Sequence, residues 1–284
     1  MKNKFNLILA FVCVFALQAQ AQDWRPGFYM KQALDITLAK ASIFEMASDY
    51  GYTDGICFMG VYLDEGEDVG WGARLEGGRE YVFIGGGDDD VTDIDIKILD
   101  DYGNVLEEDV LDDNNPVVKF MPKKSGTYNV RLKLYSCDAA GSFCAMTIMQ
   151  EHANSVPVSS LDNAVETVIG YGEYVNEQYP VKFHDIENQW CLFGAIIASG
   201  DYETITNLDL GFEDHILIAA GDDNLNDADL FLMDDNDNIL EKDVEKDAIP
   251  AIRYTTKGTT SYKLKIKNED SNGKSLLITC VLTE

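Results

Sequence analysis

Two stretches of the chain decide its fold. Residues 88–109 read DDDVTDIDIKILDDYGNVLEED, and 134 residues later residues 222–243 read DDNLNDADLFLMDDNDNILEKD. Ten of the 22 aligned positions are identical, and six of the other twelve exchange one apolar side chain for another. Self-similarity at a fixed period is the signature of a repeated architecture. Because the register has no gap, we expect the chain to contain two copies of one domain.

The same offset extends beyond these stretches. It pairs Cys57 with Cys191, Gly60 with Gly194, Pro116 with Pro250, and Tyr128 with Tyr262. The first copy also contains short runs rich in β-branched and aromatic residues, separated by Gly, Asp, Asn and Pro: Glu80–Ile84, Asp93–Leu99, Val105–Val110, Val117–Met121, Thr127–Leu134 and Phe143–Met149. Short strands with turn signals between them predict a sandwich or barrel. We therefore expect a mostly β fold of two tandem antiparallel β-sandwich (jelly-roll-like) domains, each preceded by an amphipathic α-helix.

Apolar stripes predict the two helices. The first, within Met30–Ser48, comprises Met30, Leu34, Leu38, Ala41 and Phe44, and Gly51 follows it. The second comprises Leu161, Ala164, Val165, Val168, Gly172 and Val175, with a capping box expected at Ser159-Ser160-Leu161-Asp162 and a stop at Pro180. Such spacing places the apolar side chains on one face, which indicates packing on the body of each domain. A linker near Glu151–Ser159 sets the expected domains at 22–155 and 156–284.

The repeated residues resemble a known module. The pattern D-x-D-I/L-x-I/L-x-D-D-x-x-N-x-L is followed by Pro, by an apolar strand and, in the first copy, by SGTYNVRL at 125–132. This is similar to the bacterial prepeptidase C-terminal (PPC) β-sandwich, over roughly residues 80–134 and 214–268. The resemblance implies a β-sandwich associated with secreted proteases and other exported enzymes, and some relatives bind calcium or protein substrates. This chain departs from the family in having no attached protease domain, and Thr259-Thr260-Ser261 replaces the Ser-Gly-Thr turn in the second copy.

The N-terminus predicts export. Met1–Lys4 is basic, Phe5–Leu17 is an apolar run, and Ala19-Gln20-Ala21 has small residues where a signal peptidase cleaves. We therefore expect residues 1–21 to be a signal peptide and the mature protein to be secreted or periplasmic. The apolar run is short for a membrane span of about 20 residues, so no membrane anchor is expected.

Acidic side chains dominate the charge of the chain, with 50 Asp and Glu against 22 Lys and Arg and a formal net charge of -28. Binding to phosphates requires a cationic surface, so the charge excludes nucleic acid and anionic membrane surfaces as partners. Repulsion between like-charged copies favours a monomer. Because 46% of the residues are hydrophobic, the chain has enough apolar material to form folded cores.

Removal of Cys13 with the signal leaves five cysteines: Cys57, Cys137, Cys144, Cys191 and Cys280. An odd number in an exported protein leaves at least one free thiol or an intermolecular bridge. Cys137 and Cys144 flank six residues that read as a hairpin loop, so a disulfide between them is the first prediction. The competing prediction is Cys57–Cys144 together with Cys191–Cys280, because Cys57 and Cys191 occupy equivalent positions.

One candidate metal site occurs twice. Asp88, Asp89, Asp93 and Asp95 recur as Asp222, Asp223, Asp227 and Asp229. Asp93 and Asp95 are two residues apart on a predicted strand, so their carboxylates project from one face, about 7 Å apart. Such carboxylates repel one another unless a cation neutralises them, and calcium suits flexible oxygen-rich loops. We expect one Ca²⁺ in each domain; the alternative is a solvated turn with Asx hydrogen bonds.

Enzyme motifs are absent from the sequence. It contains no GxSxG and no HExxH, and none of its three histidines (His152, His184 and His215) has a histidine at the equivalent position of the other copy. We therefore expect a protein that is not an enzyme. Trp71, Tyr102 and Tyr135 are candidates for an exposed aromatic platform that binds sugar or peptide. Trp71, however, aligns with Ile205, which favours a core position.

These observations predict a secreted, non-catalytic binding or interaction protein of tandem β-sandwich modules, with calcium as a structural ion. Its ligand would be an extracellular protein or a polysaccharide. The alternative is an exported accessory subunit or inhibitor of a secreted protease or of a polysaccharide-degrading enzyme.

Overall fold

The computed structural model describes residues 24–256, 258 and 261–284. These residues form two long helices and eighteen strands, so the fold is mostly β, as expected. The predicted signal peptide lies outside the described residues, as do Thr259 and Thr260 of the turn that departs from the PPC pattern.

The elements of the first half are α1 (Arg25–Ala47), β1 (Tyr50–Tyr52), β2 (Gly55–Asp64), β3 (Asp68–Leu75), β4 (Tyr81–Gly87), β5 (Val91–Leu99), β6 (Val105–Asp109), β7 (Val117–Phe120), β8 (Gly126–Cys137) and β9 (Gly141–Glu151). Those of the second half are α2 (Val158–Gln178), β10 (Lys182–Phe183), β11 (Leu192–Ala198), β12 (Tyr202–Asp209), β13 (Asp214–Gly221), β14 (Leu225–Asp234), β15 (Ile239–Asp243), β16 (Ala251–Thr255), β17 (Ser261–Ser271) and β18 (Lys274–Thr283). The elements therefore recur in the same order in both halves.

The strand order also recurs. In the first half, β2-β9-β4-β7 forms one antiparallel layer and β3-β8-β5-β6 forms the other. In the second half, the corresponding orders are β11-β18-β13-β16 and β12-β17-β14-β15. In each half, the first main strand lies beside the last, and the chain crosses between the two layers at every connection from β2 to β9 except the β5–β6 hairpin, and at the corresponding connections of the second half. This is the arrangement of a jelly roll, in which eight strands form two facing sheets.

The two halves share one continuous sheet. β2 pairs with β11 in antiparallel orientation, which joins the inner layers into a ten-stranded sheet. At the junction, Met59 lies opposite Phe193, its own equivalent in the repeat, and the pairs Phe58–Gly194 and Gly60–Leu192 exchange under the same offset. The junction therefore has approximate twofold symmetry. That residues 22–155 and 156–284 each fold alone stays a prediction.

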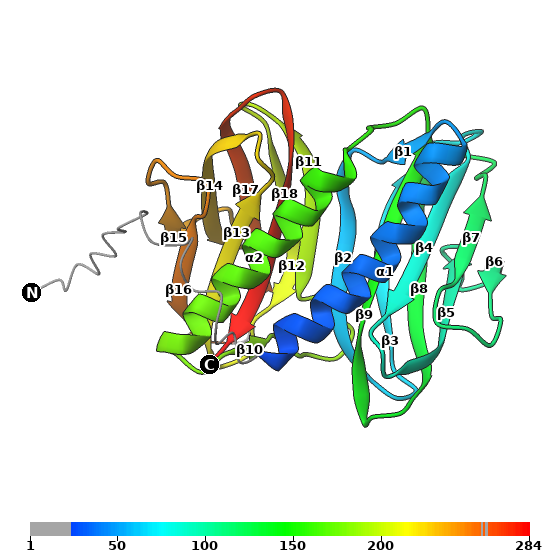
Figure 1. Cartoon of the computed structure of the whole chain (residues 1–284), viewed down its shortest axis with the longest axis horizontal. Helices are drawn as coiled ribbons and strands as arrows, with labels where there is room; N and C mark the ends of the chain where they lie inside the picture. Colours follow the sequence, from blue (N-terminus) through cyan, green and yellow to red (C-terminus); the bar gives the residue numbers. More distant parts are fainter. Residues whose placement is uncertain (1–23, 257, 259–260) are drawn as a thin grey trace, which may run out of the picture.

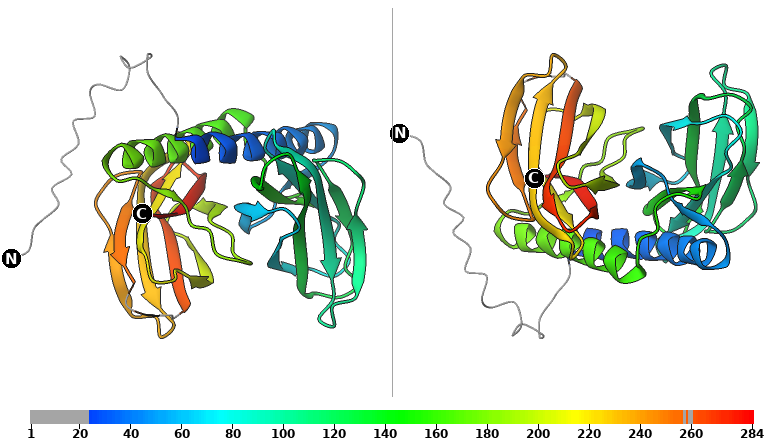
Figure 2. Two further views of the ribbon diagram at one scale, coloured as in Figure 1. Left: turned by 90° about the horizontal axis from the view of Figure 1, so that it is seen from below. Right: turned by 90° about the horizontal axis from the view of Figure 1, so that it is seen from above.

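The molecule has three layers. Both helices lie side by side on one face of the ten-stranded sheet (Figure 1), and the two four-stranded sheets cover its other face. Figure 2 shows the helices on one side of the molecule and the two halves on either side of its middle. β9 is buried on both faces: Ala145 and Met149 belong to the helix-side core, and Cys144 and Met146 belong to the core between the sheets. A strand covered on both faces reads as a continuous apolar run rather than an alternating one.

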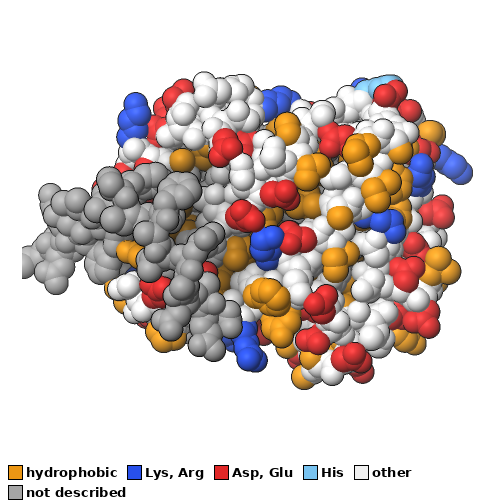
Figure 3. Space-filling model, viewed as in Figure 1, with side chains coloured by type: hydrophobic (Ala, Val, Ile, Leu, Met, Phe, Trp, Pro, Cys, Tyr) orange, Lys and Arg blue, Asp and Glu red, His pale blue; other side chains and the backbone are white. Residues whose placement is uncertain are grey.

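The surface that carries the helices is acidic but not uniform. Figure 3 shows Asp and Glu side chains spread over this face, with small groups of hydrophobic side chains between them. On α1 the exposed hydrophobic residues are Phe28, Ile43 and Met46. Neither helix of the described chain is long and apolar enough to span a membrane.

The helix stripes are confirmed, although the helix ends differ from the prediction. Met30, Leu34, Leu38 and Ala41 are buried on α1, and every predicted stripe residue of α2 is buried. The predicted capping box is wrong. Pro157 occupies the N-cap of α2 without a side-chain hydrogen bond, and Ser159 and Ser160 lie within the helix.

Trp24 fastens α1 to α2. A Cβ on Gly27 or on Gly172 would lie 2.3 or 2.5 Å from its ring, so only glycine permits this approach. The Trp24 indole Nε1–H donates to the carbonyl oxygen of Val181 at 2.8 Å, and its ring stacks on Phe183 with centroids 5.0 Å apart. These contacts join the start of α1 to the second half.

The predicted hairpin between Cys137 and Cys144 is wrong. Cys137 ends β8 in a four-stranded sheet, whereas Cys144 lies in β9 of the ten-stranded sheet, so the connection crosses between layers. All five described cysteines are free, so neither predicted disulfide arrangement is present. Cys57 belongs to the helix-side core and Cys144 to the core between the sheets, on opposite faces. Cys280 lies opposite Leu192 rather than opposite Cys191.

Candidate functional site

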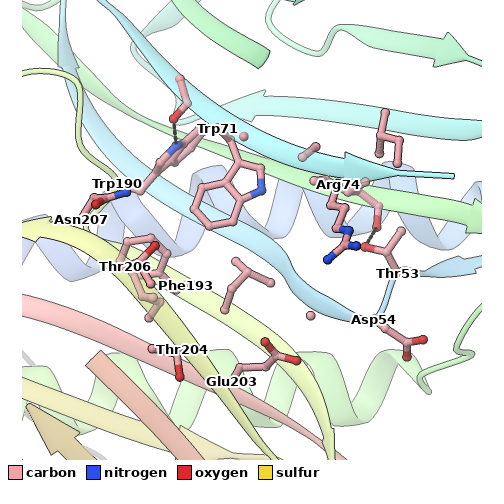
Figure 4. A pocket seen from close by; sticks show the side chains of 18 of the residues that line it. Thr53, Asp54, Trp71, Arg74, Trp190, Phe193, Glu203, Thr204, Thr206 and Asn207 are labelled. Carbon is pink, nitrogen blue, oxygen red and sulfur yellow. Dashed lines mark hydrogen bonds between the residues drawn. The ribbon is translucent and has the colours of Figure 1, made fainter. Parts of the chain in front are cut away.

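A cleft of about 830 Å³ lies between the two halves, on the side of the ten-stranded sheet away from the helices. β3 forms one wall and β12 the other, each being the edge strand of its four-stranded sheet. Ile56, Trp190 and Phe193, at the junction of β2 with β11, also line it. Figure 4 shows the cleft with its principal side chains. It is therefore built jointly by both repeats.

The two walls occupy equivalent positions but carry different side chains. Residues 70–74 of β3 read GWGAR, and the residues 134 positions later, 204–208 of β12, read TITNL. The register of β12 shifts between Ile205 and Leu208, so the two strands match residue by residue only as far as Ile205. Likewise Ile56 is equivalent to Trp190, and Asp54 to Asn188, and all four residues line the cleft. The cleft thus lies on the approximate twofold axis, yet its chemistry is asymmetric.

Trp71 is the principal aromatic side chain that the cleft exposes. It is half-buried, it packs against the core between the sheets, and its ring centroid lies 6.3 Å from that of Phe193. Trp190 is almost fully buried, and its indole Nε1–H donates to the carbonyl oxygen of Gly70 at 2.9 Å. This hydrogen bond ties the edge of β3 to the second half and therefore positions Trp71 beside Phe193 (Figure 4).

Two carboxylates from different halves also face the cleft (Figure 4). Asp54 accepts a hydrogen bond from Asn154 Nδ2 at 3.0 Å and lies 3.4 Å from the Lys274 ammonium; the hydrogen bond and then this charge lower its pKa. The oxygens of Glu203 would lie 3.9 Å from a Cβ on Gly55, so this side chain reaches toward β2. Burial first, and the negative charge of Asp54 second, raise the pKa of Glu203.

The largest chemical difference between equivalent positions of β3 and β12 is at Glu203. Its equivalent in the first half is Val69, which is fully buried in the core between the sheets. At this position the register is the same in both halves, because Glu203 lies opposite Ile266 and Val69 lies opposite Leu132. A half-buried carboxylate has therefore replaced a core valine at a position whose backbone is unchanged. None of the described residues that line the cleft is His or Cys.

The predicted calcium ligands do not converge into one site. Asp88 and Asp222 are buried and complete the turns that follow β4 and β13. Asp88 accepts the N–H groups of Asp90 and Phe143 at 3.1 and 2.9 Å. Asp222 accepts the N–H of Asn224 at 3.1 Å and the hydroxyl of Ser275 at 2.6 Å. The need of buried backbone N–H groups for a hydrogen-bond acceptor therefore explains why this aspartate occurs in both halves.

The neighbouring aspartates connect these turns to the helices. Asp89 accepts a hydrogen bond from Gln32 Nε2 on α1 at 2.6 Å. Asp223 accepts one from Asn163 Nδ2 on α2 at 2.7 Å. Both carboxylates thus have a direct role in holding a helix against its sheet.

Asp93 and Asp95 lie apart from Asp88, in an acidic hollow with Glu108 and Asp112. Burial first, and then the Asp95 charge, raise the pKa of Asp93, and burial likewise raises that of Asp95. Their equivalents are Asp227, which is largely buried, and Asp229, whose pKa is also raised, by burial.

Across the described residues, no three His, Cys, Asp or Glu side chains are arranged to hold a metal ion. The four-carboxylate site therefore does not fit the structure. Calcium binding stays a prediction. The candidate ligands that remain for it are Asp93 and Asp95, with their equivalents Asp227 and Asp229.

The predicted aromatic platform does not form, because its residues are dispersed. Trp71 lines the cleft and Tyr135 lines the acidic hollow. Tyr102 is 90% exposed on the turn between β5 and β6, and it lines neither. The alignment of Trp71 with the core residue Ile205 correctly indicated that the Trp71 ring is partly buried. It gave no sign that the rest of the ring is exposed in the cleft.

Two of the three histidines lie together, although no pattern in the sequence places them near each other. His184 and His215 are buried with ring centroids 4.9 Å apart, and the Thr283 hydroxyl lies 2.8 Å from Nδ1 of His184 and 3.4 Å from Nδ1 of His215. Burial lowers the pKa of both. Their equivalents are Tyr50, in the helix-side core, and Tyr81, in the core between the sheets, so the repeat pattern in the sequence does not pair the two positions.

No protein-family model and no curated protein sequence matches this chain. Among solved structures it is similar to the M60 catalytic domain with two CBM51 domains of Clostridium perfringens ZmpB (8% identity, 80% of this chain, 36% of that chain, TM-score 0.26). It is also similar to the PBSX exported protein XepA (12% identity, 80% and 85% of the two chains, TM-score 0.25). A third is the CBM22 tandem of Paenibacillus barcinonensis Xyn10C (8% identity, 82% and 99%, TM-score 0.22). Such low TM-scores carry no argument about function.

Proposed function

We propose that this protein is an exported, non-catalytic binding protein of two β-sandwich modules, and that its ligand occupies the cleft between them. The observation that supports this most is the divergence of the cleft walls. Equivalent positions of β3 and β12 carry Trp71 and Ile205, or Val69 and Glu203, although the two strands pair with their neighbours in the same register at these positions. Side chains that the fold does not require are free to serve a ligand.

The dimensions and chemistry of the cleft suit a binding site. Ligand sites occupy roughly 300–1,000 Å³ and combine apolar walls with a few polar groups. Here the volume is about 830 Å³, and the rings of Trp71 and Phe193 adjoin the hydroxyl and amide groups of Thr204, Thr206 and Asn207. The ligand is an extracellular protein or a polysaccharide. Polyanions are disfavoured by the net charge of -28.

The test compares the mature wild-type chain with the variant Trp71→Ala and with the control variant Tyr102→Ala. Tyr102 is an exposed aromatic residue that lies outside the cleft. Each protein is immobilised and exposed to a panel of soluble polysaccharides and to a displayed library of random peptides. Bound material is then assayed for cleavage products.

We expect binding without cleavage, lost in Trp71→Ala and kept in Tyr102→Ala. Release of products from the bound ligand would contradict the non-catalytic assignment. Equal binding by all three proteins would contradict the assignment of the cleft.

A further inference from the structure

The cleft presents unpaired strand edges. β3 is the outermost strand of β3-β8-β5-β6, and β12 is the outermost strand of β12-β17-β14-β15. Consecutive residues of both strands line the cleft, 70–75 on β3 and 203–208 on β12. Residues that alternate between the faces of a strand line one cavity together only when the edge of the strand faces that cavity. The walls of the cleft are therefore strand edges rather than sheet faces.

The register identifies the backbone groups that face the cleft. The N–H of Leu134 donates to the carbonyl oxygen of Glu67 at 3.0 Å, so the backbone groups of Glu67 face β8. Every second residue after Glu67 faces β8 in the same way, and Val69 accordingly lies opposite Leu132 and Trp71 opposite Val130. In an antiparallel ladder, only alternate residues bond to a given neighbour. Gly70, Gly72 and Arg74 therefore direct their N–H and C=O groups away from β8. The indole of Trp190 already donates to Gly70 O, which confirms that direction.

β3 is open to the close approach of another backbone. Gly70 and Gly72 carry no side chain at two of the three positions whose backbone groups point outward. Glycine within a strand often marks a place where a ligand or another backbone approaches closely. Trp71, between the two glycines, turns its ring into the cleft beside Phe193, where it can receive a side chain from the incoming segment.

The charge of the cleft selects the kind of segment. Asp54, Glu76 and Glu203 line it, against the single cation Arg74 among the described lining residues. The raised pKa of Glu203 follows from its burial near Asp54, and an incoming ammonium or guanidinium group would relieve that repulsion. Basic side chains are thus favoured and acidic ones are repelled.

We propose that the cleft binds an extended, basic segment of another protein, which adds to the edge of β3 as a further strand. This inference rests on the proposed function and names the ligand class of the same site. Main-chain hydrogen bonds to Gly72 and Arg74 supply affinity, as in other cases of strand addition. The Trp71 pocket and the carboxylates of Asp54 and Glu203 supply selectivity.

The decisive variant is Gly72→Pro, which removes an N–H that faces the cleft and no hydrogen bond to β8. Proline is tolerated on an edge strand in that orientation. The matched control is Glu108→Pro on β6, also an edge strand. Ile96 pairs with Asp109 and Ile98 with Glu107, and Ile94 N–H donates to Asp113 O, so Glu108 directs its N–H away from β5. Circular dichroism and thermal melting confirm that both variants fold.

A displayed library of random peptides is selected on the mature wild-type chain, and the enriched peptides are titrated against each variant. We expect Lys- and Arg-rich peptides whose affinity falls at least about tenfold in Gly72→Pro and stays unchanged in Glu108→Pro. The double variant Asp54→Asn, Glu203→Gln should weaken these peptides by about tenfold as well. Two versions of each peptide should also be compared, one N-methylated at its odd-numbered residues and one at its even-numbered residues. One version should lose binding and the other should keep it, because only one edge of the peptide faces β3.

Three results would overturn the inference. Enriched peptides that bind Gly72→Pro as well as wild type would exclude strand addition at β3. Binding of neutral oligosaccharides that depends on Trp71, with no peptide enriched, would replace the peptide by a carbohydrate and leave the proposed function standing. Absence of any ligand that depends on Trp71 would remove both proposals.

Discussion

The aspartate turns and the cleft walls occupy equivalent places in the two halves, but only the turns are alike. Asp100 Oδ1 accepts the N–H groups of Tyr102 and Asn104 at 2.9 and 2.8 Å. Asp234 Oδ1 accepts the corresponding groups of Asn236 and Asn238, both at 2.9 Å. The chain reverses direction at each of these points, and the aspartate satisfies backbone groups that the reversal leaves without strand partners.

The cleft walls show the opposite behaviour. None of the five residues at 70–74 is identical to the residue 134 positions later, although both strands pair with their neighbours in one register from Val69 to Trp71 and from Glu203 to Ile205. Beyond Ile205 the register of β12 shifts, so the backbone of the two walls diverges there as well. Identity between the halves therefore marks side chains that the fold uses. At the cleft walls, by contrast, the side chains differ between the halves, and we infer that the fold leaves them free to serve a ligand.

The largest expected effect is on a turn aspartate. Asp88→Ala leaves the N–H groups of Asp90 and Phe143 without an acceptor in a buried place, so we expect a loss of about 2–3 kcal/mol in the free energy of unfolding. Urea denaturation measures it. The control is Asp89→Ala, which removes one exposed side-chain hydrogen bond and should cost less than about 1 kcal/mol. Equal losses in the two variants would mean that backbone capping is not the role of Asp88.

A cleft variant should separate binding from stability. Trp71→Ile installs the residue found at the equivalent position of β12, so we expect a loss of only about 1 kcal/mol in the free energy of unfolding. Affinity for the enriched ligand should fall by at least about tenfold, because the exposed aromatic surface is removed. Denaturation and ligand titration of one preparation measure both quantities. A stability loss as large as that of Asp88→Ala, with affinity intact, would assign Trp71 to the core.

The smallest expected effect is that of calcium on the free energy of unfolding. Asp88 and Asp89 are engaged by backbone and by α1, which leaves Asp93 and Asp95 as the carboxylates that a cation would join in the first half. Two carboxylates bind a hard cation weakly, so millimolar calcium should raise stability by less than about 1 kcal/mol. Thermal melting with calcium and with chelator measures the shift, and Asp95→Asn should reduce it. A rise of several kcal/mol would show that more ligands converge than the structure brings together.

Local patterns in the sequence predicted local structure well. The stripe from Leu161 to Val175 is buried on α2 as expected, because helical spacing alone determines which residues share a face. The turn at Asp100–Asn104 likewise follows from its composition. The capping box failed because Pro157 begins the helix before the two serines are reached.

The cleft could not be predicted from local patterns. β2 and β3 were not recognised as strands, and β2 is a nearly continuous buried run without the alternation that marks a half-exposed strand. The cleft requires the pairing of β2 with β11, which are far apart in sequence. The disulfide prediction failed for a related reason: Cys137 and Cys144 are close in sequence but belong to different sheets.

Glu203 provides the sharpest contrast between the two regions. Since burial and the charge of Asp54 raise its pKa above the ordinary value of 4.5, the folded chain binds this proton more tightly than the unfolded chain does. The free energy of unfolding therefore falls as pH rises from about 4.5 through the raised pKa. Replacing Glu203 by valine, its equivalent in the first half, removes this loss, so the benefit should be larger at pH 7 than at pH 4.5.

The melting temperature of Glu203→Val at pH 7 is the most direct test of the claim that divergence in the cleft serves a ligand rather than the fold. We predict that the variant melts above the wild-type chain, with a gain of about 1 kcal/mol in the free energy of unfolding. A melting temperature below that of wild type would show that the folded structure needs this carboxylate, and it would contradict the account.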